Sequence, residues 1–208
     1  MPKNTQKLAP ELDLIQVGAM TRSSFILKSA LTIGATAGAA AVGPFVSTAM
    51  AQADGDVEIL NFALTLEYLE TRFYKEAADK GLSSEVAKLA KQFADEEQEH
   101  VNALRKAVKS LGGTVAAKPE FDFGVTDEAS FLKLAQTLED TGVYAYNGAG
   151  PALKNKDLLA AAGSIVQIEA RHAAAIRLIN KENPSPDAFD KTLTVDEVLE
   201  AVKPLIVS

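Results

Sequence analysis

One pattern of glutamate and histidine occurs twice in the chain, the second time 72 residues after the first (67 to 139, 97 to 169 and 100 to 172). The repeated positions are Glu67 and Glu139, Glu97 and Glu169, and His100 and His172. No other histidine occurs in the sequence. Mixed carboxylate and imidazole groups bind divalent ions such as iron or manganese, and zinc by affinity. The duplication predicts a site for two metal ions, with iron as the first candidate and manganese as the alternative.

The match extends beyond these ligand candidates. Thr65-Leu66-Glu67 recurs as Thr137-Leu138-Glu139, and Tyr74 recurs as Tyr146. The two tyrosines are either aromatic core residues or hydrogen-bonding partners of the ligand carboxylates. We take Tyr74 and Tyr146 as candidate catalytic residues.

The repeat also decides between neighbouring acidic residues. Glu70 lies on the same apolar arc as the predicted ligand Glu67, but its counterpart is Gly142. Glu96 directly precedes the next predicted ligand, but its counterpart is Ile168. The unmatched pairs of the repeat are Glu70 with Gly142 and Tyr68 with Asp140. At these unmatched positions we expect substrate access or chemistry to differ between the two metals.

Four helical segments carry the predicted ligands. Apolar residues recur with helical period over residues 57–80, 84–111, 127–147 and 157–182, and the predicted ligands interrupt these stripes. Residues three apart share a helix face, so each Glu-x-x-His pair presents a carboxylate and an imidazole to one point. Four carboxylates buried together would destabilise the fold unless cations neutralised them. Two divalent ions would meet this requirement.

The connections between the helices predict a topology. The first and second helices are joined by a few residues, and so are the third and fourth through Gly148-Ala149-Gly150-Pro151, which we expect to break the third helix. About 14 extended residues, 112–125, separate the two pairs and can span up to about 46 Å. These lengths predict an all-α, antiparallel four-helix bundle with a long crossover between helices two and three.

The last segment, residues 184–208, is predicted to be a tail with one short helix. Thr194-Val195-Asp196-Glu197 is a capping-box pattern ahead of Val198 and Leu199. We expect this helix to cover one end of the bundle.

At all six positions the ligand pattern resembles the ferritin-like di-metal carboxylate superfamily, in which two helices supply one Glu each and two supply Glu-x-x-His. Residues 60–70, Leu-Asn-Phe-Ala-Leu-Thr-Leu-Glu-Tyr-Leu-Glu, and residues 194–204 more narrowly resemble a secreted ferritin-like branch related to stress and desiccation. The resemblance covers residues 55–204. It implies a ferritin-like bundle whose metal site reacts with oxygen or peroxide.

Residues 1–51 are predicted to be an export signal peptide, with Met20 as an alternative start. A basic segment containing Arg22 and Lys28 precedes an apolar stretch, and Ala49-Met50-Ala51 is a small-x-small cleavage site. The segment resembles a twin-arginine signal, but Ser23 stands where the second arginine is expected, so the Sec route is the alternative. An uncleaved anchor is the other interpretation, although residues 29–46 are marginal for spanning a membrane. We expect a periplasmic or extracellular protein that is not inserted in the membrane after cleavage, with the bundle over residues 52–183.

Composition narrows the function. The 208 residues, 47% of them hydrophobic, suffice for one core-forming domain. The net charge of −7 argues against a nucleic-acid partner, and the absence of cysteine excludes thiolate metal sites, iron–sulfur clusters and disulfides. We expect a ferroxidase or peroxidase-like oxidoreductase whose partners are metal ions and oxygen or peroxide. The alternatives are a metal-stabilised bundle that protects other components under stress, and a manganese catalase-like enzyme; a homodimer is compatible with each.

Overall fold

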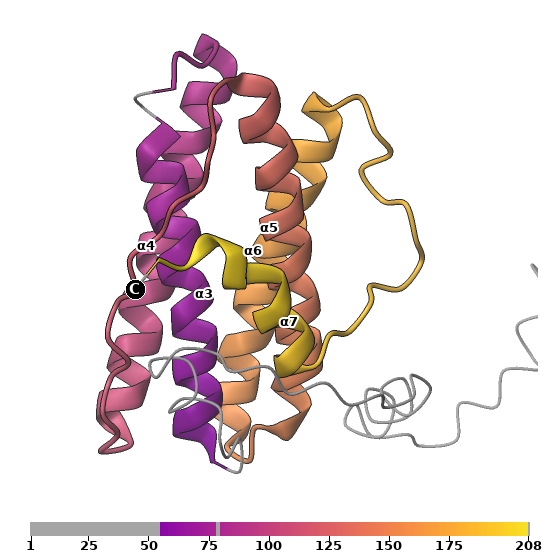
Figure 1. Cartoon of the computed structure of the whole chain (residues 1–208). Coiled ribbons are helices and arrows are strands. Elements are labelled where there is room, and N and C mark those ends of the chain that lie inside the picture. Colours follow the sequence, from indigo (N-terminus) through magenta and orange to yellow (C-terminus); the bar gives the residue numbers. More distant parts are fainter. Residues whose placement is uncertain (1–54, 78–79, 208) are drawn as a thin grey trace, which may run out of the picture. The chain divides into compact units, whose positions relative to one another are not determined.

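Five α-helices account for most of the chain that the computed structural model describes, which is residues 55–77 and 80–207 (Figure 1). They are α3 (Asp56–Glu76), α4 (Ser84–Ser110), α5 (Glu128–Ala149), α6 (Lys156–Ile179) and α7 (Val195–Val202), with the single 3-10 turns η3 (Gly150–Ala152) and η4 (Lys203–Leu205). In this part of the chain, β pairing is limited to an isolated antiparallel bridge between Phe121 and Ile206. The prediction of an all-α fold is confirmed. The predicted export signal, residues 1–51, lies outside the described residues.

The four long helices form two hairpins, α3 with α4 and α5 with α6. Between them, residues 111–127 run along the bundle from the end of α4 to the start of α5 (Figure 1). The side chain of Asn61 fastens this crossover to α3: its Nδ2 donates to the carbonyl of Thr114 at 2.9 Å, and its Oδ1 accepts from the N–H of Ala116 at 2.8 Å. The predicted four-helix bundle with a long crossover is therefore the observed architecture. Over residues 55–77 and 80–207, no helix is both long and apolar enough to span a membrane.

Side chains and glycines set the helix ends. Asp127 caps α5 by accepting from the N–H of Ser130 at 2.8 Å, and Thr194 caps α7 in the predicted capping box with Glu197. Gly81 and Gly112, which follow the first two long helices, have φ values of +66° and +74°, a region that favours glycine. Two helices are shorter than predicted: α3 ends at Glu76 and α6 at Ile179.

The segment Gly148-Ala149-Gly150-Pro151 ends α5, as the sequence predicts, but Gly148 itself is still helical. The helix continues to Ala149 and passes into η3. A Cβ atom at position 148 would lie 1.9 Å from the carbonyl oxygen of Leu193, so this glycine allows the C-terminal segment to approach the helix backbone. The same contact includes a hydrogen bond from the N–H of Leu193 to the carbonyl of Tyr144 at 3.1 Å.

The C-terminal helix lies across the side of the bundle, and the expectation that it covers one end is wrong (Figure 1). It packs on α5, and Val198 and Val202 are 0% and 2% exposed. Beyond it, the N–H of Val207 donates to the carbonyl of Glu120 at 2.9 Å. These contacts bury the apolar face of α7 and pair a backbone carbonyl of the crossover. Together they hold α7 on the side of the bundle.

Two apolar clusters fill the bundle, one containing Tyr74 and the other containing Tyr146. Leu69 and Phe131 are each 1% exposed, and burial of such a side chain stabilises the fold by roughly 1.5–3 kcal/mol. Glutamates lie buried in the same interior, which is unfavourable for ionised groups without partners.

Candidate metal centre

Six ionisable side chains from the four long helices meet inside the bundle. They are Glu67 from α3, Glu97 and His100 from α4, Glu139 from α5, and Glu169 and His172 from α6. They form two overlapping groups that share Glu97 and Glu169, and within each group one ligand atom per residue lies within 4.8 Å of the others. All four carboxylates are 0% exposed. The structure thus brings together every residue that the repeat predicts as a metal ligand.

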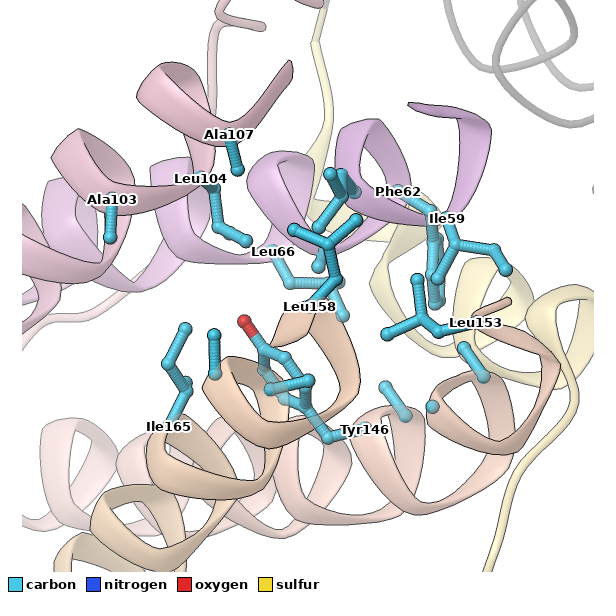
Figure 2. Close-up of a pocket in the computed structure, with 17 residues that line it drawn as sticks. Ile59, Phe62, Leu66, Ala103, Leu104, Ala107, Tyr146, Leu153, Leu158 and Ile165 are labelled. Carbon is cyan, nitrogen blue, oxygen red and sulfur yellow. The ribbon is translucent and has the colours of Figure 1, made fainter. Parts of the chain in front are cut away.

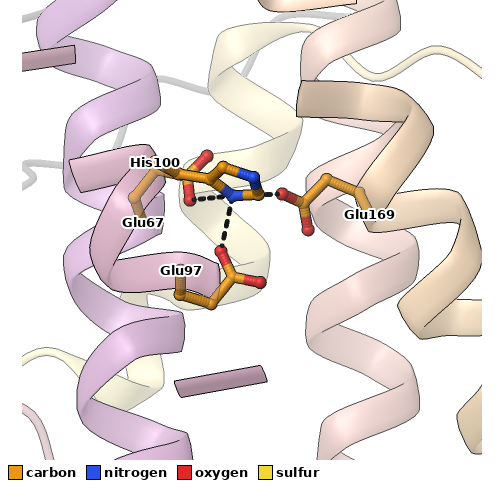
Figure 3. A group of neighbouring side chains, drawn as sticks. All are labelled: Glu67, Glu97, His100 and Glu169. Atoms are coloured by element: carbon orange, nitrogen blue, oxygen red, sulfur yellow. Dashed lines mark hydrogen bonds and ion pairs between the residues drawn. The ribbon is translucent and has the colours of Figure 1, made fainter. Parts of the chain in front are cut away.

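The imidazole of His100 organises the first group (Figure 3). Its Nδ1 atom lies 3.2 Å from Glu67 Oε2, 3.0 Å from Glu97 Oε2 and 3.2 Å from Glu169 Oε1. Three carboxylate oxygens from three helices therefore converge on one ring nitrogen, where an ion would find four ligand atoms.

The imidazole of His172 contacts two of the three carboxylates of the second group. Its Nδ1 atom lies 2.9 Å from Glu97 Oε1 and 3.4 Å from Glu139 Oε2. Glu97 thus turns one oxygen toward each histidine, which is the position of a carboxylate that can bridge two ions.

Several buried atoms of the centre have no hydrogen-bond partner among the described residues. They are Glu97 Oε1, Glu139 Oε2, both carboxylate oxygens of Glu169, and His172 Nδ1. The close approach of His172 Nδ1 to two of these oxygens lacks the geometry of a hydrogen bond. Buried polar atoms are nearly always paired, and an unpaired one is destabilising by about 1–3 kcal/mol. Oxygen and imidazole ligands that face a common point without partners fit divalent cations.

The pKa values of the buried carboxyl groups are shifted in different directions. Burial, reinforced by the charge of Glu97, raises the pKa of Glu67 to about 8, and it raises the pKa of Glu169 well above its ordinary value. Burial acts in the same direction on Glu97, but its contacts with His100 and His172 prevail and lower its pKa to about 2. Without metal, some carboxyl groups of the centre therefore carry protons at neutral pH.

The two histidines are the counter-charges of this cluster. Burial alone would lower the pKa of His172, but the carboxylates of Glu139 and Glu97 outweigh it and raise the pKa to about 11. The pKa of His100 is also raised, against the effect of burial, by the carboxylates around it. Metal ions would take the place of these protons, so metal binding should release protons.

Each tyrosine of the repeat holds a ligand from the opposite hairpin. The hydroxyl of Tyr74 on α3 donates to Glu139 Oε1, and the hydroxyl of Tyr146 on α5 donates to Glu67 Oε1. The other oxygen of each glutamate faces a histidine, as described above. Of the two interpretations of the tyrosines, the structure supports hydrogen bonding to the ligand carboxylates. Each phenol fixes which carboxylate oxygen is turned toward the centre.

Glu96 has a role that the sequence did not predict. Its Oε2 lies 2.6 Å from Nε2 of His172, on the outer edge of the ring, and Phe93 stacks on the same imidazole at 3.8 Å between ring centroids. The carboxylate orients the ring so that Nδ1 faces the centre. The repeat ruled out Glu96 as a ligand because its counterpart is Ile168.

Glu70 is a fifth buried carboxyl group, 2% exposed, beside the centre. It belongs to neither group of ligand atoms, which agrees with the choice of Glu67 from the repeat. Burial, together with the charges of Glu169 and Glu97, raises the pKa of Glu70 well above its ordinary value. Glu70 is therefore a buried neighbour of the candidate ligands.

Comparison with known sequences agrees with this geometry. No curated protein matches the chain. Residues 55–182, more than half of the chain, match the family described as ferritin-like domain. The matched segment contains all six residues of the centre and the four long helices that carry them. The chain belongs to the ferritin-like domain family.

Proposed function

We propose that the centre binds two divalent metal ions, with iron as the preferred metal, and that the protein oxidises ferrous iron with oxygen or peroxide. The observation that supports the proposal is the set of buried carboxylate and imidazole atoms that make no hydrogen bond and belong to two overlapping groups of possible ligands. Two ferrous ions supply the two electrons that reduce one dioxygen to hydrogen peroxide, or one hydrogen peroxide to two water molecules, and either reduction takes up two protons.

The side chains of the centre would bind the ions, fix the orientation of the ligands and exclude bulk water. Glu97 and Glu169 belong to both ligand groups, so they can hold two ions at a fixed separation. The two tyrosines keep the terminal carboxylates in one orientation. Burial of the four carboxylates keeps bulk water away from the centre. The reaction is thereby confined to ions and small oxidants.

The outer edge of His100 supplies a route from solvent. This residue lines an open hollow on the surface together with Asp95, Glu96 and Glu99. Lys88 and Lys91 line it too, and Lys91 pairs with Asp95 at 2.6 Å. The three carboxylates outnumber the two ammonium groups, so the hollow keeps a negative charge that attracts cations toward the imidazole. We propose this hollow as the path by which ferrous ions reach the centre.

Aerobic addition of ferrous iron to the metal-free protein tests the proposal. Oxidation should run faster than in buffer, with about two metal ions bound per chain by elemental analysis. Glu97→Gln and His172→Ala should bind less metal and oxidise iron no faster than buffer. The matched control Glu120→Ala, on the exposed crossover, should bind metal and oxidise iron like the unmodified protein. Equal oxidation rates in the ligand variants and the unmodified protein would refute the oxidase. Metal that raises the melting temperature without turnover would favour the non-enzymatic bundle, and disproportionation of peroxide with bound manganese would favour the catalase.

We also propose that the protein is exported, in connection with stress or metal handling. Support comes from the basic segment, apolar stretch and small-x-small site of residues 20–51. N-terminal sequencing of the protein recovered from the producing cells should begin at Gln52 if the signal is removed. A chain that keeps residues 20–51 would contradict cleavage.

A further inference from the structure

An apolar cavity of about 60 Å³ lies at the end of the bundle where α3 and α6 begin (Figure 2). Its walls come from all four long helices and η3, and include Leu60, Leu104 and Leu153. Among the described residues that line it, Tyr146 alone has a polar side chain. That hydroxyl donates to Glu67, so the cavity borders the side chain that holds a predicted metal ligand.

The opposite end of the bundle, around Tyr74, is filled by aromatic rings. The ring centroids of Phe73, Phe93 and Phe131 lie 5.1, 5.4 and 6.1 Å from that of Tyr74. The hollow that borders Phe73 and Phe131 measures about 10 Å³. The two tyrosines make equivalent hydrogen bonds, but their surroundings differ in packing.

The 72-residue repeat explains this difference. The counterparts of the three phenylalanines are Ala145 for Phe73, Ile165 for Phe93 and Ile59 for Phe131. All three counterparts line the cavity. Where one half of the repeat places three phenyl rings against its tyrosine, the other half places a methyl group and two branched aliphatic side chains. The cavity is the space that the missing rings leave.

Small side chains separate the cavity from solvent. Ala103 on α4 and Ala161 on α6 both line it and are exposed, whereas Leu104 and Ile165 are 4% and 7% exposed. A molecule can therefore enter past two methyl groups. Apolar cavities of this kind stay dry and take up apolar molecules; a cavity of roughly 150 Å³ accommodates benzene or xenon. At about 60 Å³, the present one is too small for benzene and suits a guest such as one xenon atom or a diatomic gas.

We propose that this cavity is a binding site for a neutral apolar molecule of the size of dioxygen, held beside Tyr146 on the Glu67 side of the metal centre. Binding in the cavity depends only on its lining. Delivery of dioxygen from it to the centre rests on the proposed function. Because only the half that contains Tyr146 lacks the three rings, dioxygen would reach the metal centre from that side alone. The candidate ligands themselves are the same in both halves.

Xenon is the probe that tests occupancy, because it is apolar, is visible in electron density and does not require metal. Crystals of the full chain under xenon pressure should show one xenon atom against Ala145 and Ile165. Ala145→Leu should abolish it by filling the space, and Ile165→Phe, which restores the ring present in the other half, is a second filling variant should the first not fold. Ala129→Leu, an equal addition at an exposed position of α5, should leave the xenon atom in place.

The reciprocal change is equally informative. Phe73→Ala should open a second xenon site beside Tyr74. Absence of xenon from the cavity of the unmodified protein, or its persistence in both filling variants, would overturn the proposal. For delivery, Ala145→Leu should raise the oxygen concentration needed for half-maximal iron oxidation without changing the number of ions bound; an unchanged oxygen dependence would refute delivery. If the unmodified protein oxidises no iron, the proposed function fails while the xenon result still decides the site.

Discussion

Glu70 on α3 lies against Gly142 on α5, and a Cβ atom at position 142 would be 3.1 Å from Glu70 Oε1. The two positions are counterparts in the repeat, since 142 follows 70 by 72 residues. One half of the molecule therefore carries an additional carboxyl group, and the other half lacks a side chain at the same place, which leaves room for it. The unmatched pair in the sequence is a packed pair in the structure.

Gly142→Ala should disturb the centre without unfolding the protein. The new methyl group would lie 3.1 Å from Glu70 Oε1, so the Glu70 carboxyl group must move by a few tenths of an ångström, and it would be in ordinary contact with Glu169 Oε2 at 3.6 Å. We expect weaker binding of at least one metal ion, measured by calorimetric titration. Gly163→Ala on α6 is the matched control, because its methyl group meets nothing within 4 Å. The control should gain about 0.5–1 kcal/mol from helix propensity and leave metal affinity unchanged. Equal metal binding in the two variants would contradict a role of this contact.

Removal of either phenol should destabilise the metal-free protein. Tyr146→Phe leaves Glu67 Oε1, and Tyr74→Phe leaves Glu139 Oε1, without the donor observed in the structure. The loss of such a partner in the interior should lower the free energy of unfolding by about 1–3 kcal/mol in urea denaturation. Tyr144→Phe, at a partly exposed position of the same helix, should stay within about 0.5 kcal/mol. Similar losses in all three variants would show that the hydrogen bonds to the carboxylates are not the cause.

Glu96→Gln should reduce the metal affinity of one position of the centre and leave that of the other unchanged. The carboxylate is the partner of the outer nitrogen of His172, and loss of such a partner typically reduces metal affinity about 10–100-fold. The corresponding residue of the other half, Ile168, offers no carboxylate to His100, so that half should not respond. A calorimetric titration should resolve two steps of which only one shifts. Glu85→Gln, at an exposed position of α4 outside the hollow, is the control; a uniform shift of both steps would argue against an orienting role for Glu96.

The helices and the convergence of the six glutamates and histidines could be predicted because both depend on short-range patterns. An apolar stripe interrupted by Glu-x-x-His shows which face of a helix is buried. The repeat shows the same pattern in both halves, which identifies the matching residues. The position of α7 could not be predicted, since it depends on how closely the carbonyl of Leu193 approaches Gly148 across the fold. The same limit applies to the outer partner of His172, which comes from a different helix.

Differences between the halves show this limit most clearly. Tyr68 and Asp140 are unmatched in type, yet each is the acceptor for an arginine: Arg105 Nη1 donates to Tyr68 Oη at 2.6 Å, and Arg177 Nη2 donates to Asp140 Oδ1. The two arginines are themselves 72 residues apart. A mismatch in residue type can therefore preserve a contact, whereas the Glu70 and Gly142 mismatch creates a new one. Residue types alone do not distinguish the two cases, because the outcome depends on which side chain faces which helix.

The metal-free protein should lose stability as the pH rises from about 5 to about 9. In the folded state the pKa of Glu67 is raised from 4.5 to about 8, so its contribution to stability is complete below pH 4.5 and is lost as the pH rises through 8. The pKa of His172 is raised from 6.5 to about 11, and its contribution is likewise lost with rising pH, from 6.5 upward. Glu97 has the opposite sign, but its pKa is lowered to about 2, so its contribution is lost only in acid, below 4.5.

Bound metal should reverse this dependence, because the ions replace the protons and bind more tightly as the ligands deprotonate. Melting temperatures measured across the same pH range should therefore fall in the presence of a chelator and rise with manganese, which avoids oxidation during the measurement. Glu67→Gln cannot lose a proton, so the chelated variant should show a smaller fall than the unmodified protein. A melting temperature of the chelated protein that stays constant or increases with pH would contradict the protonated, buried cluster.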